Sequence, residues 1–299
     1  MKQFTFGAIG AAVLSAFLYA LSTPFSKLLL AQVSAGMLAS LLYLGAGMGM
    51  GIWYAAQKCT KGANAEHHLQ RSDLGYVLLM IVLDIAAPLL FFYGLKASGA
   101  ASAALLNNFE LVATALIALV LFHEPIGKRL WFGILLITCA SILLSLDGLE
   151  SGVGLSFSVS SLLIPAACIC WGLENNCTRK LSSRNPVEIV MVKGLFSGLG
   201  AGIVALFMGE TLPALLPTVL TLLLGFCAYG LSIRFYVYAQ RTLGAAKTGV
   251  YSAIAPFFSA ILCVILFDDP CSIQFFAAFL LMLAGVCLTT LSTKLPMEK

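Results

Sequence analysis

Ten stretches of about 20 mostly apolar residues follow one another along this chain and leave little sequence between them. Their approximate bounds are 6–30, 33–56, 74–95, 99–121, 130–146, 158–178, 187–208, 217–239, 245–266 and 272–293. An apolar helix of this length matches the hydrocarbon thickness of a bilayer. The longest connection, from Gln57 to Asp73, is too short for a soluble domain. We therefore expect an all-α membrane protein with ten transmembrane helices.

The composition excludes most other classes of protein. Of the 299 residues, 60% are hydrophobic and 10% are charged, whereas soluble domains carry about 25% charged residues. A soluble enzyme, a secreted disulfide scaffold and a disordered chain are therefore excluded. The net charge of +4 comes from basic residues scattered over short loops, so we expect no nucleic-acid partner. The three histidines and nine cysteines show no zinc-binding spacing, and we expect no metal and no cofactor.

The basic residues predict how the chain is oriented in the membrane. Of the 17 Lys and Arg residues, 12 fall in loops or termini on one side of the predicted membrane and 2 near helix ends on the other. Because cytoplasmic loops carry an excess of Lys and Arg, the N-terminus and the C-terminus are both predicted to be cytoplasmic. We expect a multi-pass protein of the plasma membrane, in bacteria the inner membrane.

The chain also resembles itself at a fixed offset. Shifting the sequence by 145 places Phe122–Pro125 on Phe267–Pro270 without a gap. Each half then contains five predicted spans, and an odd number makes the second half enter the membrane from the opposite side. This pattern predicts two inverted five-helix repeats, residues 1–150 and 151–299, an architecture common among secondary transporters.

Small residues at helical spacing in two of the spans predict close packing of helices. The second span contains Gly45/Gly49 and Gly47/Gly51, and the seventh contains Gly194/Gly198/Gly202. Small residues four positions apart allow helix backbones to approach closely in lipid.

Several motifs resemble those of a known family when they are taken in order. They are Asn108–Ala118 followed by Phe122–Pro125, Trp171–Asn176, Leu243–Tyr251, and Ala253–Ala260 followed by Phe267–Pro270. The chain resembles the EamA-type ten-helix carriers of the drug/metabolite transporter superfamily over nearly all ten spans. The resemblance implies transport, with spans 1, 3, 4, 6, 8 and 9 around a central cavity and spans 5 and 10 at the periphery. Similar proteins export amino acids, other metabolites or drugs, and some move nucleotide sugars or sugar phosphates. The sequence departs from the family at Asp268-Asp269, where a Glu is more usual.

Charged and polar residues within the apolar stretches are the candidate site residues. A charge at the bilayer centre costs about 2.5–3.5 kcal/mol on insertion scales, so such residues face a cavity or a partner. The candidates for the substrate cavity are Tyr19, Asp84, Asn107, Glu110, Thr114, Trp171, Glu174, Arg234, Tyr238, Lys247 and Tyr251.

Some of these candidates have a structural interpretation as well. Asn107, Glu110 and Thr114 share one helical face, which either lines the cavity or forms an interhelical hydrogen-bond network. Glu174 has a potential ion-pair partner in Lys193, and Lys247 is placed to extend to the cytoplasmic interface.

The charged residues of the candidate spans indicate which class of substrate the cavity binds. The candidate spans carry carboxylates as well as Arg234 and Lys247, together with aromatic side chains, so a zwitterion with an apolar side chain fits both signs. We therefore expect a secondary transporter that exports amino acids or related small metabolites by alternating access. The alternative is a multidrug or cationic-compound exporter that uses Glu110 alone.

Other expectations concern partners and competing classes. A carboxylate near the midplane makes H⁺ the expected coupling ion. The functional unit is expected to be a monomer or a dimer. An intramembrane enzyme is disfavoured because the chain contains no HExxH or GxSxG motif. A receptor or structural membrane protein is disfavoured by the internal repeat.

Overall fold

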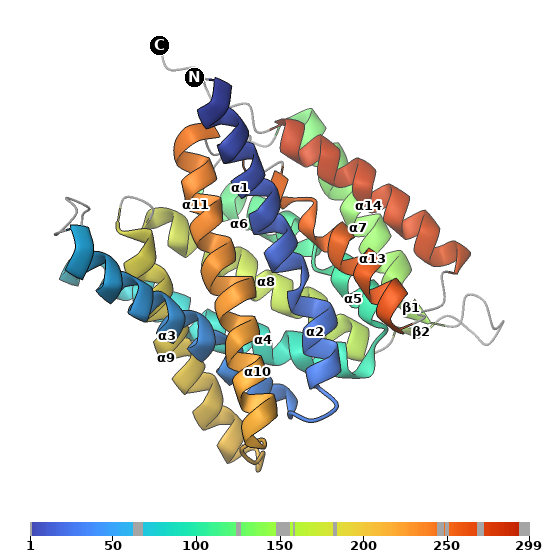
Figure 1. Ribbon diagram of the computed structural model, residues 1–299. Helices are drawn as coiled ribbons and strands as arrows, with labels where there is room; N and C mark the ends of the chain where they lie inside the picture. Colours follow the sequence, from blue (N-terminus) through green and yellow to red (C-terminus); the bar gives the residue numbers. More distant parts are fainter. Residues whose placement is uncertain are drawn as a thin grey trace.

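The computed structural model describes residues 2–61, 68–123, 127–147, 156–157, 159–181, 184–243, 248, 251–267 and 272–292. These residues form a bundle of helices that cross one another at steep angles (Figure 1). In chain order the helices are α1 (Lys2–Ala20), α2 (Ser22–Leu29), α3 (Ala35–Lys61), η1 (Arg71–Asp73), α4 (Leu74–Ala97), α5 (Ala100–Leu106), α6 (Phe109–Phe122), α7 (Lys128–Ser145), α8 (Val159–Lys180), α9 (Pro186–Phe207), α10 (Leu215–Gly225), η2 (Phe226–Leu231), α11 (Ser232–Leu243), α13 (Ala255–Phe267) and α14 (Ile273–Ser292). Between α7 and α8, the strands β1 (Leu146–Asp147) and β2 (Ser156–Phe157) form a short antiparallel pair.

Each stretch that was expected to span the membrane overlaps helix in the described residues, and residues 245–247, 249 and 250 of the ninth stretch lie outside them. Eight helical stretches are long and apolar enough to cross a membrane, which confirms the all-α membrane class. The other two expected spans are α8 and α13. Helix α8 has 22 residues but contains Glu174 and ends in Arg179 and Lys180, and α13 is an apolar helix of 13 residues.

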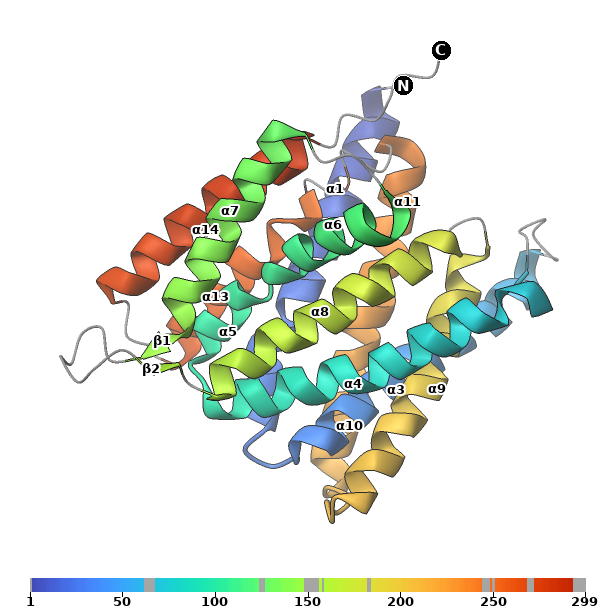
Figure 2. The same ribbon diagram turned by 180° about the vertical axis from the view of Figure 1, so that it is seen from behind.

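The main helix pairs each combine one helix from each half of the chain. Helix α3 packs along α9, α4 along α8, α1 along α11, α5 along α13 and α7 along α14. The two views from opposite sides show α4 beside α8 near the centre, and α7 beside α14 at one flank (Figures 1 and 2).

Glycines bring α3 into close contact with its neighbours, as predicted from their spacing. A Cβ atom on Gly47 would lie 2.5 Å from the backbone nitrogen of Leu195, and one on Gly45 would lie 2.1 Å from the carbonyl oxygen of Leu222. Real Cβ contacts are not this short, so the backbones of α3, α9 and α10 approach each other only because these positions lack side chains.

Among the described residues, four expected spans contain an irregularity near their middle; in the ninth it lies at Ala253 and Ile254, directly before α13. The first is interrupted at Leu21, between α1 and α2, and the fourth at Asn107 and Asn108, between α5 and α6. The eighth contains the π-helix η2, in which the backbone holds more residues per turn than in an α-helix. Such irregularities position side chains that a continuous α-helix would direct elsewhere.

The loop between α9 and α10 is fixed by the carboxylate of Glu210. This carboxylate accepts hydrogen bonds from Ser34 Oγ at 2.7 Å, the backbone N–H of Met37 at 2.9 Å, that of Gly36 at 3.2 Å and Tyr93 OH at 2.7 Å. Burial acts to raise the pKa of Glu210, but the donated hydrogen bonds outweigh it and hold this pKa below its ordinary value. Glu210 thereby caps the start of α3 and ties it to α4.

Candidate functional site

A cavity of about 240 Å³ lies between the two halves of the chain. Its walls come from α1, α3, α6, α8, α9, η2 and α11. The lining residues are Tyr19, Tyr43, Ala46, Glu110, Trp171, Glu174, Asn175, Val190, Lys193, Gly194, Tyr229 and Ile233. Carboxylates, aromatic rings and a single amine in the described lining distinguish it from an apolar packing defect.

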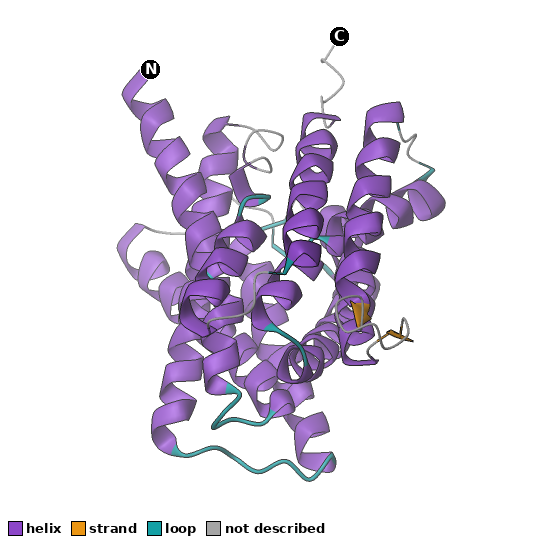
Figure 3. Cartoon of the chain, turned by 90° about the vertical axis from the view of Figure 1, so that its right-hand side faces the viewer, coloured by secondary structure: helices purple, strands orange, loops and turns teal. Residues whose placement is uncertain are grey.

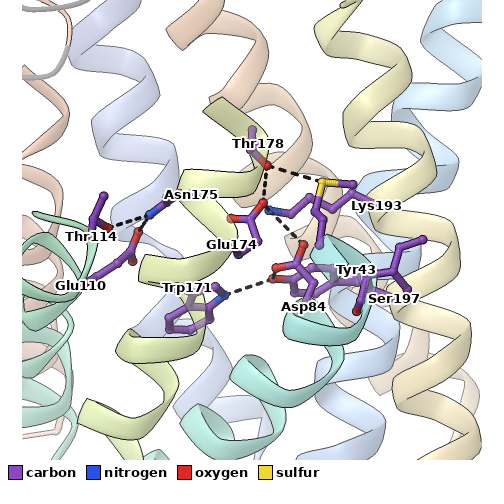
Figure 4. Close-up of polar contacts among 12 residues, drawn as sticks. Tyr43, Asp84, Glu110, Thr114, Trp171, Glu174, Asn175, Thr178, Lys193 and Ser197 are labelled. Atoms are coloured by element: carbon purple, nitrogen blue, oxygen red, sulfur yellow. Dashed lines mark hydrogen bonds and ion pairs between the residues drawn. The ribbon is translucent and has the colours of Figure 1, made fainter. Parts of the chain in front are cut away.

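Glu110 lies in the first turn of α6, directly after the interruption at Asn107 and Asn108. Its Oε1 accepts a hydrogen bond of 2.6 Å from Asn175 Nδ2 on α8. The same amide also donates to Thr114 Oγ1 at 3.4 Å (Figure 4).

The closeness of α8 to α6 makes these hydrogen bonds possible. A Cβ atom on Gly172 would lie 2.7 Å from the Cβ of Ala113, so the two helices touch at this glycine. One turn further along α8, Asn176 Nδ2 donates to the carbonyl oxygen of Thr114 at 3.1 Å. The polar face that the sequence indicated on the fourth span therefore meets amide side chains of the sixth.

Lys193 links three helices by its ammonium group. Its Nζ lies 3.0 Å from Asp84 Oδ2 on α4 and 3.0 Å from Glu174 Oε1 on α8, while Lys193 itself belongs to α9 (Figure 4). The side chain of Asp84 is fully buried and that of Glu174 nearly so, whereas that of Lys193 is 20% exposed. Buried carboxylates need a partner of opposite charge, and Lys193 serves both of them.

Neutral donors complete the environment of the two carboxylates. Tyr43 OH donates to Asp84 Oδ1 at 3.1 Å, and Trp171 Nε1 in turn donates to Tyr43 OH at 3.4 Å. Thr178 Oγ1 donates to Glu174 Oε1 at 2.5 Å. This network holds the side chains of Asp84, Glu174 and Lys193 in fixed positions.

Aromatic rings form much of the remaining wall. The ring of Tyr229 lies with its centroid 5.8 Å from that of Tyr19, at an angle of 83°, and 5.8 Å from that of Tyr43. Trp171 packs against Phe91 of α4, with a centroid distance of 5.5 Å. Tyr229 belongs to the π-helix η2, and π-helical turns occur frequently at functional sites.

The structure brings most of the residues singled out from the sequence to this cavity or its immediate support. Tyr19, Glu110, Trp171 and Glu174 line it. Asp84 supports it through Lys193 and Tyr43, and Thr114 through Asn175. Asn107 lies at the break before α6, where its Oδ1 is 3.8 Å from Cys168 Sγ.

The other singled-out residues lie elsewhere or outside the described residues. The guanidinium of Arg234 stacks on the ring of Trp53, 4.4 Å from its centroid, and Arg234 is not part of the described cavity lining. Tyr238 is 50% exposed. Tyr251 packs against the apolar cluster of Ala11, Ala12 and Ala239. Lys247 lies outside the described residues.

Four of the polar and aromatic lining residues were not among the candidates from the sequence. They are Tyr43, Asn175, Lys193 and Tyr229. One available signal is the offset of 145, which places Tyr229 at the position equivalent to Asp84. Lys193 and Asn175 are polar residues within apolar stretches, but Lys193 belongs to the seventh span, which is not among those that the family resemblance places around the cavity.

Comparisons with known proteins agree with this architecture. The model of the EamA-like transporter family matches residues 6–146 and 159–291, so the chain belongs to that family. It is a multi-pass membrane protein, as the eight apolar helices and the family together show.

Two relatives carry the name of uncharacterized transporters. One, from Methanothermobacter thermautotrophicus, is 27% identical over 231 residues, which cover 74% of this chain and 66% of the relative. The other, YyaM from Bacillus subtilis, is 23% identical over 194 residues, covering 63% and 64%. The chain thus spans just under two thirds of the length of these relatives. A solved crystal structure matches over 99% of both chains with a TM-score of 0.64 and 19% identity, a likeness that concerns the fold alone.

Proposed function

We propose that this protein is a secondary transporter that carries a small organic cation through the cavity by alternating access. Family membership supports transport. The substrate class is inferred from the charges of the described site. Three carboxylates, those of Asp84, Glu110 and Glu174, accompany one ammonium group, that of Lys193.

The charges are unequally available to a substrate. Lys193 is already held between Asp84 and Glu174, so it is engaged before any ligand arrives. Glu110 has an amide partner, Asn175, and faces the cavity. An incoming ammonium group therefore finds a carboxylate that it can pair with, whereas an incoming carboxylate has to compete for Lys193 with two existing anionic partners.

The aromatic rings favour the same class of substrate. Tyr19, Tyr43, Trp171 and Tyr229 all contribute to the lining. A cation is attracted to the face of an aromatic ring, and quaternary ammonium groups are recognised in cages of such rings. Apolar substituents on the cation gain further from burial against these walls.

The zwitterionic amino acid expected from the sequence is less well supported. That expectation depended on Arg234 or Lys247 as the partner of the substrate carboxylate. Arg234 stacks on Trp53 away from the described lining, and Lys247 lies outside the described residues. The cationic alternative, which requires Glu110 alone, is therefore the one that we propose.

The proposal includes ten spans in two inverted repeats, residues 1–150 and 151–299. The interruption at Asn108 has a counterpart at Ala253, 145 residues later, where the helix is broken before α13. The helix pairs also support the repeat, because exchanging the halves turns the pair α1 and α11 into the pair α8 and α4. Helix α1 begins and α14 ends at the same end of the bundle, in keeping with an even number of spans (Figure 3).

The remaining elements of the proposal follow the sequence. The excess of basic residues supports cytoplasmic termini. The proposed location is the plasma membrane, in bacteria the inner membrane. We propose export, with H⁺ taking the place of the cation on Glu110 in the return step, and a monomer or a dimer as the functional unit. A proton and an organic cation cannot share one carboxylate, so they exchange.

Transport into proteoliposomes tests this function. We expect purified protein to move benzyltrimethylammonium, which carries a permanent charge, and Glu110→Gln to abolish this movement. Glu188→Gln is the matched control, because Glu188 interacts with His68 near the start of α9 rather than with the cavity. Movement of leucine with no movement of the cation would instead support the amino-acid exporter.

A further inference from the structure

The two carboxylates on the cavity wall, those of Glu110 and Glu174, differ in the groups that they bind. Glu110 accepts a hydrogen bond from the neutral amide of Asn175. Glu174 already holds a cation, because the ammonium of Lys193 lies 3.0 Å from its Oε1. In a site that binds cations, the first carboxylate is open to a substrate and the second is filled by a side chain of the protein.

The position of Lys193 explains how it stays at Glu174. Its second partner, Asp84, is fully buried and lies behind the cavity wall, where Tyr43 OH also donates to it. Lys193 and Glu174 both line the cavity. The contact with Asp84 is therefore a deep anchor, and the contact with Glu174 is the one that a substrate cation meets.

The two carboxylates belong to one continuous wall. Asn175, whose amide holds Glu110, is the chain neighbour of Glu174 on α8. Tyr19, Tyr43, Trp171 and Tyr229 line the same cavity. A rigid aromatic molecule with a cationic group at each end would match two carboxylates among aromatic rings in its chemistry. In this chain, however, the ammonium of Lys193 already fills the cation subsite at Glu174.

We propose that Lys193 is a specificity-determining residue that occupies the second cation subsite, at Glu174, and restricts the cavity to monocations. The inference rests on the proposed function, since it assumes that Glu110 binds the substrate cation. Its consequence is a gain of binding: a chain without the Lys193 ammonium accepts a dication across Glu110 and Glu174.

The test compares two permanent cations that share one ring. One is benzyltrimethylammonium, and the other carries a second trimethylammonium group on the opposite side of the ring. The measured quantity is the ratio of the Kd of the monocation to the Kd of the dication, obtained by calorimetry on detergent-purified protein. Because both probes keep their charge at every pH, titration of the probe does not contribute to the ratio.

The variants are chosen so that folding does not decide the result. Lys193→Met leaves Asp84 buried without a counter-charge, so Lys193→Met/Asp84→Asn removes both charges together and keeps the net charge of the site. Adding Glu174→Gln to this pair provides the matched control, because it removes the carboxylate that the ammonium had covered.

We expect the ratio to rise by about tenfold or more in Lys193→Met/Asp84→Asn, and to return to the wild-type value when Glu174→Gln is added. A ratio that stays within about twofold of wild type in the pair variant, or a rise that persists without Glu174, would overturn the inference. The proposed function is judged separately by Glu110→Gln. If that variant binds the monocation as tightly as wild type does, the proposed function is wrong, whatever the ratio.

Discussion

The ammonium of Lys193 lies 3.0 Å from Asp84 Oδ2 and 3.0 Å from Glu174 Oε1, so one side chain of α9 holds α4 and α8 together. This contact joins helices from both halves of the chain beside the cavity. Since the side chains of both carboxylates are almost completely buried, both depend on the ammonium of Lys193 as their counter-ion.

Lys193→Met is therefore expected to destabilise the folded protein by about 3–5 kcal/mol, because it leaves buried carboxylates without a counter-ion. The measurement is thermal or denaturant unfolding of the purified protein in detergent. Lys193→Met/Asp84→Asn is expected to recover a large part of the loss. If the single and the double variant unfold alike, Asp84 does not depend on Lys193 for its charge.

Loss of the Glu210 carboxylate is expected to weaken the start of α3. Glu210→Ala removes the acceptor for Ser34 and for two backbone N–H groups, and loss of a helix cap costs about 0.5–2 kcal/mol. Unfolding midpoints of the variant and wild type measure this difference. Thr211→Ala, next in the same loop, is the control and should unfold close to wild type.

Wild type and Glu210→Ala are also expected to differ in how their stability depends on pH. Because the pKa of Glu210 is lowered in the folded state, its contribution to stability is present above the ordinary pKa of a glutamate. This contribution is lost as the pH falls through the lower pKa of the folded state. The difference in unfolding midpoint between wild type and Glu210→Ala should thus shrink on acidification. A difference that grows towards acid pH would contradict the hydrogen bonds to an ionised carboxylate.

A side chain at Gly47 should separate α3 from α9. A Cβ atom there would lie 2.5 Å from the backbone nitrogen of Leu195, and an overpacked core typically loses about 1–3 kcal/mol. We expect Gly47→Val to lower the unfolding temperature in detergent and the yield of monodisperse protein. Gly10→Ala serves as the control, since a Cβ atom on Gly10 meets nothing within 4 Å. Equal unfolding temperatures and yields of the two variants would argue against close packing of α3 on α9.

Replacing Tyr229 should weaken binding of an organic cation. Its ring lies among those of Tyr19 and Tyr43 on the cavity wall, and loss of a cation–π contact costs about 0.5–2 kcal/mol. Calorimetry with benzyltrimethylammonium should show a weaker Kd for Tyr229→Leu. Tyr238→Leu is the matched control, because Tyr238 is 50% exposed on α11. Equal losses in both variants would mean that the ring of Tyr229 does not contact the ligand.

The membrane class could be predicted because it depends on the length of apolar runs, which the bilayer imposes directly. Helix α8 shows where this signal weakens. It carries Glu174, Asn175 and Asn176, which lower its hydropathy while they build the site. The polar residues that α8 contributes to the candidate site are therefore those that make it less recognisable as a span.

The candidate site was foreseeable only in part. Glu110 and Glu174 stand out because a charge within an apolar run requires a partner or water. Arg234 stands out for the same reason, yet its partner is the ring of Trp53, which is far away in sequence. Tyr229 reaches the cavity through a π-helix, whose altered period is invisible to a pattern of 3.6 residues per turn.

The π-helix η2 also affects how this chain tolerates insertions and deletions. A π-turn is an α-helix with one residue inserted, and each residue of an α-helix turns the chain by about 100°. Removing one residue from Phe226–Leu231 would restore an ordinary helix without breaking the span. It would also rotate Tyr229 relative to α11, and with it the wall that this ring forms. The shape of the cavity therefore depends on the number of residues between α10 and α11 as much as on their chemistry. A relative with the same side chains but one residue fewer in this segment would have a different cavity.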